Sequence, residues 1–158
     1  MLAEAGYPDG KGFPKVTYKY NTNEGNKNIA EALQAMWKRN LGIEVELYNE
    51  EWKVFINTRF QKNYQIARHA YLVDFFDPAS LMDILVSDSP ENVTGYNNPE
   101  YDAKRIGYLL KAEDILMQDL PVLPINYYST PYMVSERVKG MYISPRNWDF
   151  FRGVEIAE

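Results

Sequence analysis

Two stretches near the start of the chain alternate apolar and polar residues, and a helical pattern lies between them. Residues 15–20 and 43–48 repeat with a period of two, which predicts β-strands. Residues 27–40 carry apolar side chains on one helical stripe, and we expect Asn23 to cap this helix and Gly42 to follow its end. Strand, helix and strand in this spacing predict a right-handed crossover with parallel strands. The predicted inward residues are Val16, Tyr18, Tyr20, Ile29, Leu33, Met36 and Trp37.

Further along, the pattern predicts one long strand and four more helices. Residues 64–74 contain no glycine or proline and are rich in β-forming side chains, so we expect a central strand there. Helical stripes or helix-start signals mark residues 51–60, 77–86, 101–106 and 108–119. Strands alternating with helices predict an α/β fold. The predicted inward residues of these helices are Trp52, Phe55, Ile56, Phe60, Leu81, Met82, Leu85, Ala112, Ile115 and Leu116.

Composition narrows the classes of function. The chain has 158 residues, which is the size of a single domain spanning residues 1–158. Its net charge of −5 is spread along the sequence, which argues against a nucleic-acid surface. The lack of cysteine excludes disulfides, a thiol nucleophile and a cysteine-based zinc site, and we expect no cofactor or metal. Aromatic residues make up 15%, more than a core this small needs, so some of them should line a groove.

Two opposite charges lie on one face of the predicted central strand. Alternation places Arg68 and Asp74 on the same face as Ile66, Ala70 and Leu72. The two charges are about 20 Å apart in an extended chain, too far to pair, and desolvating either one unpaired costs several kcal/mol. One possibility is that each has its own protein partner or lies at a hydrated strand end. The other is a zwitterionic ligand of roughly two to five residues, with its carboxylate on Arg68 and its ammonium group on Asp74.

A resemblance to a known family is carried by residues 51–83, EWKVFINTRFQKNYQIARHAYLVDFFDPASLMD. This run resembles the corresponding segment of the oligopeptide-binding proteins of bacterial ABC importers, the dipeptide/oligopeptide solute-binding family. In that family a Trp-Lys helix carries an arginine near its end, and an Ala-Arg strand leads to an aspartate before the next helix. The resemblance implies a lobe of the type II periplasmic-binding-protein kind, with a mixed sheet and flanking helices. The resemblance also implies that the chain corresponds to the C-terminal lobe of a two-lobed protein.

The same resemblance implies a binding site for a short, extended peptide. Asp74 would hold the amino terminus of the peptide, Arg59 and Arg68 would attract its carboxylate, and main-chain groups at residues 70–72 would pair with its backbone. Asn26 matches a position where a relative carries a histidine beside the ligand. The other residues expected to contact the ligand are Trp52, Ala70, Tyr71, Leu72, Tyr127 and Tyr128.

The family also implies partners and a location for the parent protein. It would act in the periplasm or at the extracytoplasmic face of the membrane, together with its own N-terminal lobe and an ABC permease. We expect no signal peptide in this stretch, and the alternative is a truncated or engineered isolated lobe with little ligand affinity. Such a lobe would expose aromatic surface, which would allow self-association. Relatives have a longer helix and a loop between the positions of Ala103 and Lys104, which are neighbours here.

Three residues raise the question of other chemistry. His69, the single histidine, lies on the strand face opposite Asp74, so we expect a core or surface role rather than a catalytic one. Asp74 and Asp77 could form the carboxylate pair of a hydrolase, because glycoside hydrolysis uses two carboxyl groups about 5 to 10 Å apart. Asp77 is better explained as a helix cap, and no other catalytic pattern is visible. We therefore expect no enzymatic activity.

Overall fold

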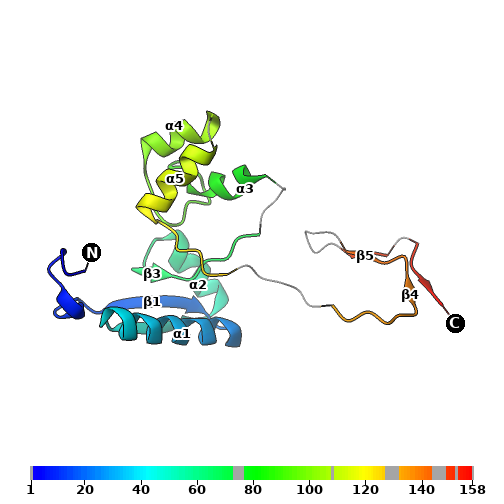
Figure 1. Cartoon of the computed structure of the whole chain (residues 1–158), viewed down its shortest axis with the longest axis horizontal. Helices are drawn as coiled ribbons and strands as arrows, with labels where there is room; N and C mark the ends of the chain where they lie inside the picture. Colours follow the sequence, from blue (N-terminus) through cyan, green and yellow to red (C-terminus); the bar gives the residue numbers. More distant parts are fainter. Residues whose placement is uncertain are drawn as a thin grey trace. The chain divides into compact units, whose positions relative to one another are not determined.

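The structure, a computed structural model, describes residues 2–72, 77–107, 109–126, 132–143, 149–151 and 153–157. The chain divides into two compact units, Met1–Val122 and Leu123–Glu158 (Figure 1). The first unit contains a three-stranded sheet with its helices and a separate helical cluster, and the second contains two small antiparallel ladders. No helix within the described residues combines the length and the apolar character needed to cross a membrane.

Strand β1 (Val16–Asn21) lies at the centre of the sheet in the first unit. A short 3-10 helix, η1 (Pro8–Gly10), precedes it. β1 pairs in parallel with β2 (Val45–Glu50) on one side and with β3 (Ile66–Ala67) on the other. The predicted parallel arrangement of the first two strands is therefore confirmed.

The third strand differs from its prediction. The sequence predicts a long central strand over residues 64–74, but of the described residues only Ile66–Ala67 join the ladder, and they lie at its edge. One further bond, from the backbone N–H of Arg68 to the carbonyl oxygen of Lys19 at 2.8 Å, precedes the departure of the chain from the sheet. β1 lies at the centre because its alternate tyrosines are buried. Arg68 and His69, which follow β3, instead bind side chains of neighbouring elements.

Helix α1 (Glu24–Leu41) packs on this sheet. Its predicted cap is confirmed, since the Asn23 side chain accepts a backbone N–H at 3.2 Å, and the helix ends at Gly42 in the left-handed conformation. The prediction that Met36 faces inward is wrong, because the buried stripe is centred on Ala30, about a third of a turn away. The core between helix and sheet consists of Tyr18, Tyr20, Ala30 and Val45, with Val16, Leu33, Trp37, Ile43, Leu47 and Ile66 packed against it.

Helix α2 (Trp52–Phe60) turns a different face inward from the one predicted. Phe55 is fully buried, and Arg59, one turn later on the same face, is buried with it. Trp52 and Phe60, which the sequence predicts to be inward, are half exposed. Apolar residues occur on all sides of this short helix, so periodicity alone does not select the buried face. The consequence is that a cation occupies an inward position.

A helical cluster forms the rest of the first unit. Asp77 caps the first of its helices as predicted, accepting the backbone N–H of Ala79 at 2.8 Å. Leu81, predicted to be inward, is half exposed, because Ser80 takes a buried position in this short helix. The elements are α3 (Pro78–Met82), η2 (Asp83–Leu85), α4 (Pro99–Gly107) and α5 (Leu109–Asp119) (Figure 1).

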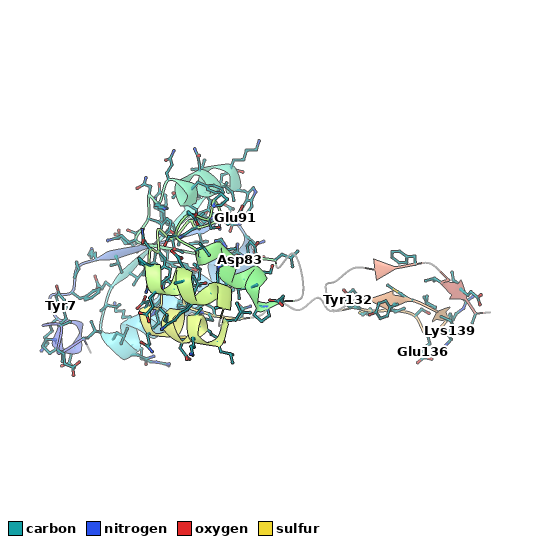
Figure 2. The ribbon with its side chains drawn as sticks, turned by 90° about the horizontal axis from the view of Figure 1, so that it is seen from above. Tyr7, Asp83, Glu91, Tyr132, Glu136 and Lys139 are labelled. Atoms are coloured by element: carbon teal, nitrogen blue, oxygen red, sulfur yellow. The ribbon has the colours of Figure 1, made fainter. Side chains whose placement is uncertain are left out.

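A hydrophobic core and polar contacts hold this cluster together. The core residues are Met82, Ile84, Leu85, Tyr101 and Ala112, and the predicted Ile115 and Leu116 pack against them. The hydroxyl of Tyr101 donates to the carbonyl oxygen of Met82 at 2.6 Å, and Arg105 pairs with Asp83. Figure 2 labels Asp83. Helix α4 is continuous through Ala103 and Lys104.

The second unit contains two antiparallel ladders. β4 (Val138–Lys139) pairs with β7 (Glu155–Ile156), and β5 (Tyr142–Ile143) pairs with β6 (Asp149–Phe150). The guanidinium Nε of Arg137 donates to the carbonyl oxygen of Ala157 at 2.8 Å, beside the first ladder. Residues 121–126 contain no strand.

Candidate functional site

The structure brings several predicted site residues together where β1 and β3 end. The two strands are parallel, so their carboxyl ends lie on the same side of the sheet, which is where α/β proteins commonly bind ligands. Asn21 ends β1, while Arg68 and His69 follow β3. Arg59 comes from the last turn of α2, and Asn26 from the first turn of α1. Four elements therefore contribute side chains to this edge.

Arg59 is a buried cation at this edge. Only 8% of the residue is exposed, and its guanidinium carbon lies 5.4 Å from the centre of the Phe55 ring. Nη1 donates to Nδ1 of His69, while Nε is buried and has no hydrogen-bond partner among the described residues. Burial lowers the pKa of Arg59, and the neighbouring cation of Arg68 lowers it further. A buried guanidinium with an unused donor is a candidate binding site for an anion.

His69 makes a contact that the sequence does not predict. The chain leaves the ladder after Ala67, so strand alternation no longer fixes where the following side chains point. The imidazole contacts Arg59, and its ring stacks on Tyr71 with the centroids 6.4 Å apart. Burial, followed by the repulsion of Arg59 and Arg68, lowers the pKa of His69 to about 4. The imidazole is therefore neutral at pH 7.

Arg68 is linked to Asn26 through Asn21. Nη1 of Arg68 donates to Oδ1 of Asn21 at 3.4 Å, and Nδ2 of Asn26 donates to the same oxygen at 3.0 Å. Nδ2 of Asn26 also donates to the main-chain oxygen of Asn21 at 3.3 Å. The buried amide of Asn26 thus fixes the end of β1 and orients the oxygen that Arg68 contacts.

Ala70 and Leu72 follow the end of β3 and present main chain that is not paired within the described structure. Ala70 is exposed, Leu72 is 80% exposed, and neither forms a backbone hydrogen bond within the described part of the chain. Tyr71 between them is partly buried and packs against the core of the helical cluster. This alternation is typical of an extended chain with one face anchored and the other turned outward.

The remaining predicted contacts divide into two groups. Trp52 stands at the start of α2, at the other end of the helix from Arg59, and is 50% exposed. Asp74, Tyr127 and Tyr128, predicted to hold the amino terminus and to form the walls of the pocket, lie outside the described residues.

Two hollows of the described surface lie away from these residues. One, of about 440 Å³, is lined by side chains of α1 and β2 together with Lys15 and residues 43–44. The other, of about 340 Å³, is lined by Thr17, Lys19 and residues 62–65. Neither hollow includes a predicted site residue.

The sequence matches a known family and is similar to several of its members. Residues 1–93 match the family described as bacterial extracellular solute-binding proteins, family 5 Middle. The chain is 35% identical to the oligopeptide-binding protein OppA of Bacillus subtilis, over 96% of the chain and 30% of that protein. It is 34% identical to the periplasmic murein peptide-binding protein MppA of Escherichia coli, over 100% of the chain and 32% of that protein. The chain thus spans about a third of the length of these relatives.

Solved structures are similar over nearly the whole chain. Haemophilus influenzae OppA in complex with the peptide RPPGFSPFR superposes with a TM-score of 0.82 and 34% identity, over 99% of this chain and 33% of that one. The murein tripeptide-binding protein MppA of Escherichia coli gives a TM-score of 0.82 and 33% identity over the same shares. These likenesses confirm the predicted fold class, an α/β lobe of the type II periplasmic-binding-protein kind.

Proposed function

Because the chain belongs to the bacterial extracellular solute-binding proteins of family 5, we propose that it is a peptide-binding part of an ABC importer's oligopeptide-binding protein. Two of the similar proteins are named for binding oligopeptides and murein peptides, and a solved one holds the peptide RPPGFSPFR. The chain would act as one domain equivalent to the C-terminal lobe. The missing N-terminal lobe would close the ligand in, and an ABC permease would receive it.

The observation that carries this proposal is the exposed main chain of Ala70 and Leu72, neither of which forms a backbone hydrogen bond within the described residues. An extended peptide lying along it would gain main-chain hydrogen bonds that do not depend on the side chains of the peptide. Tyr71 supports the arrangement, because its packing against the helical cluster anchors the segment from the other face. Ala70 and Leu72 would then supply the donors and acceptors for the ligand.

The arginines beside this segment would attract the carboxylate of the peptide. Arg59 is buried, has an unused Nε–H, and forms no ion pair with any described carboxylate. Arg68 is oriented by Asn21, which is itself held by Asn26. Arg59 and Arg68 favour a ligand whose carboxylate lies beside them, because charge-assisted hydrogen bonds are stronger than neutral ones.

The amino terminus and the walls of the site follow from the family resemblance. Asp74 would accept the ammonium group of the peptide, and Trp52, Tyr127 and Tyr128 would form the walls of the pocket. Side chains of the ligand would lie in roomy, hydrated pockets, so recognition would depend mainly on its two termini. The parent protein would act in the periplasm or at the extracytoplasmic face of the membrane, and we infer that this chain catalyses no reaction.

Calorimetric titration with three related peptides tests the proposal. Trialanine offers both termini, trialaninamide lacks the carboxylate, and N-acetyl-trialanine lacks the ammonium group. We expect trialanine to bind about 10- to 100-fold more tightly than either blocked peptide, because each blocked end loses one charge-assisted contact. Equal affinity for the three peptides would refute recognition through the termini.

Paired variants assign each end of the ligand. Arg68→Gln should weaken trialanine but leave trialaninamide unaffected, and Asp74→Asn should weaken trialanine but leave N-acetyl-trialanine unaffected. Arg39→Gln and Asp88→Asn remove equal charges from exposed positions and should change none of the three affinities. A loss of trialanine affinity as large in these controls as in the site variants would mean that net charge, rather than the site, attracts the peptide.

The alternative, an isolated lobe with little affinity, makes a different prediction. One wall of a two-lobed cleft would bind trialanine weakly, and submicromolar affinity would rule that alternative out. The aromatic surface left exposed would also favour self-association. Sedimentation velocity at several concentrations measures it, and a strictly monomeric profile would contradict it.

A further inference from the structure

The single histidine of the chain contacts the buried arginine of the site. Nη1 of Arg59 donates to Nδ1 of His69, and this is the hydrogen bond that the guanidinium makes within the described residues. The guanidinium carbon of Arg59 lies 5.4 Å from the centre of the Phe55 ring, and Tyr71 stacks on His69. The guanidinium therefore has two neighbours, the Phe55 ring and the imidazole of His69.

The chemistry of the two groups fixes which nitrogen carries the proton. A guanidinium has only donors, so Nδ1 of His69 must accept and cannot be protonated. The neutral ring then carries its proton on Nε2. A second proton on this ring would place a cation against Arg59 and close to Arg68.

His69 does not occupy the edge of the guanidinium that is formed by Nε and Nη2. The N–H bonds of Nε and Nη2 point in the same direction and match the two oxygens of a carboxylate. Nε is buried and has no partner among the described residues, whereas Nη1 is held by His69. The bond from Nη1 thus fixes the rotation of the whole planar group.

We propose that His69 is a positioning residue, which holds Nη1 of Arg59 through Nδ1 so that the Nε and Nη2 edge is set for the carboxylate of the ligand. The inference rests on the proposed function for its ligand, but the contact itself can be tested without any ligand. His69 would not touch the peptide carboxylate; it acts through Arg59.

Protonation of His69 would release Arg59, so carboxylate recognition would depend on pH. The charged groups that face the pair are Arg68, which disfavours a second cation, and Glu91 (Figure 2), which acts on Arg59, with Tyr64 beside them. Burial, followed by the charges of Arg59 and Arg68, opposes protonation of His69, so the ring stays neutral well below its ordinary pKa. The preference for a carboxylate should hold from pH 7 to pH 5 and fall as the pH approaches 4.

Nitrogen-15 NMR of the chain tests the contact directly, since one histidine gives one set of ring signals. We expect the Nε2–H form at pH 7 and a midpoint of protonation well below that of an exposed histidine. The Nδ1–H form, or an ordinary midpoint, would overturn the inference whatever the peptide measurements give.

Two substitutions separate positioning from packing. In His69→Asn, Oδ1 is bonded to Cγ as Nδ1 is in histidine, so it can accept from Arg59 but does not titrate. His69→Phe keeps a ring against Tyr71 but offers no acceptor. The ratio of trialanine to trialaninamide affinity should survive in His69→Asn and fall about fivefold in His69→Phe, the equivalent of one hydrogen bond.

The wild type and His69→Asn should also differ in acid. Between pH 5 and pH 4 the ratio should fall more steeply in the wild type than in His69→Asn, where only the ligand and the carboxylates of the protein titrate. An unchanged ratio in His69→Phe, or equal pH profiles in the wild type and His69→Asn, would overturn the positioning role. If the wild type itself failed to bind trialanine while showing the Nε2–H form, the proposed function would fail and the contact between His69 and Arg59 would stand.

Discussion

Acidification from pH 7 to pH 5 should destabilise the folded chain through His69. This is the single histidine of the sequence, and no other type of side chain ordinarily titrates in that range. In the unfolded chain His69 takes up a proton near its ordinary pKa of 6.5, but in the folded chain its pKa is lowered to about 4, first by burial and then by Arg59 and Arg68. Below pH 6.5 the unfolded state therefore binds more protons than the folded state, and the free energy of unfolding decreases as the pH is lowered.

The size of this effect follows from the two pKa values. A shift from 6.5 to about 4 corresponds to about 3 kcal/mol when it is fully expressed, and about 2 kcal/mol of this is lost by pH 5. His69 is only partly buried, so solvent screening reduces the expected loss to about 1 kcal/mol. The stabilisation is complete above pH 6.5 and disappears as the pH falls through about 4. Carboxylates titrate near that lower limit, so pH 7 to 5 is the informative range.

Urea unfolding followed by circular dichroism at pH 7, 6 and 5 measures the loss. We expect the midpoint of the wild type to fall by about 0.5 M urea between pH 7 and pH 5. His69→Asn is the matched control, because its amide cannot titrate, and its midpoint should stay constant. A constant midpoint in the wild type, or an equal fall in His69→Asn, would refute the assigned environment of this imidazole.

Two further substitutions test the packing. Gly42→Ala should destabilise the chain by about 2 kcal/mol more than Gly12→Ala: both glycines have positive φ, but only at Gly42 would a Cβ lie 2.2 Å from the carbonyl oxygen of Asp9. Equal losses in urea unfolding would mean that the contact relaxes at little cost. Tyr101→Phe should cost about 1 to 3 kcal/mol, because the buried oxygen of Met82 loses the hydroxyl that donates to it at 2.6 Å. An unchanged unfolding midpoint would show that the oxygen finds another donor.

The first part of the fold could be predicted from the sequence because its signals are local and agree with one another. The apolar stripe of α1 lies between Asn23 as a cap and Gly42 as a stop, and two alternating segments flank it. Each signal depends on neighbouring residues only. The prediction failed at residues 64–74, where residue type favours a strand but the position of a strand in the sheet depends on the other strands.

The candidate site was predictable only in part. A resemblance in sequence identified Arg59, Arg68 and Asn26, and the structure brings these three to one edge of the sheet. The contact between Arg59 and His69 has no signal in the sequence. It exists because α2 turns a cation inward and the chain leaves the ladder immediately before the histidine. Both conditions are tertiary, and strand alternation predicts a different orientation for His69.

The short pairing of β3 with β1 has a consequence for native-state fluctuations. Only two residue pairs form this ladder, and they join positions 48 residues apart, whereas β1 and β2 are paired over six positions. Local opening should therefore release β3 at a much lower free energy than global unfolding, while the β1–β2 pair stays closed. In hydrogen exchange the amide of Arg68 should accordingly lose protection well before those of β1 that face β2. The edge of the sheet that carries Arg59 and Arg68 would then open and close many times within the lifetime of one folded molecule.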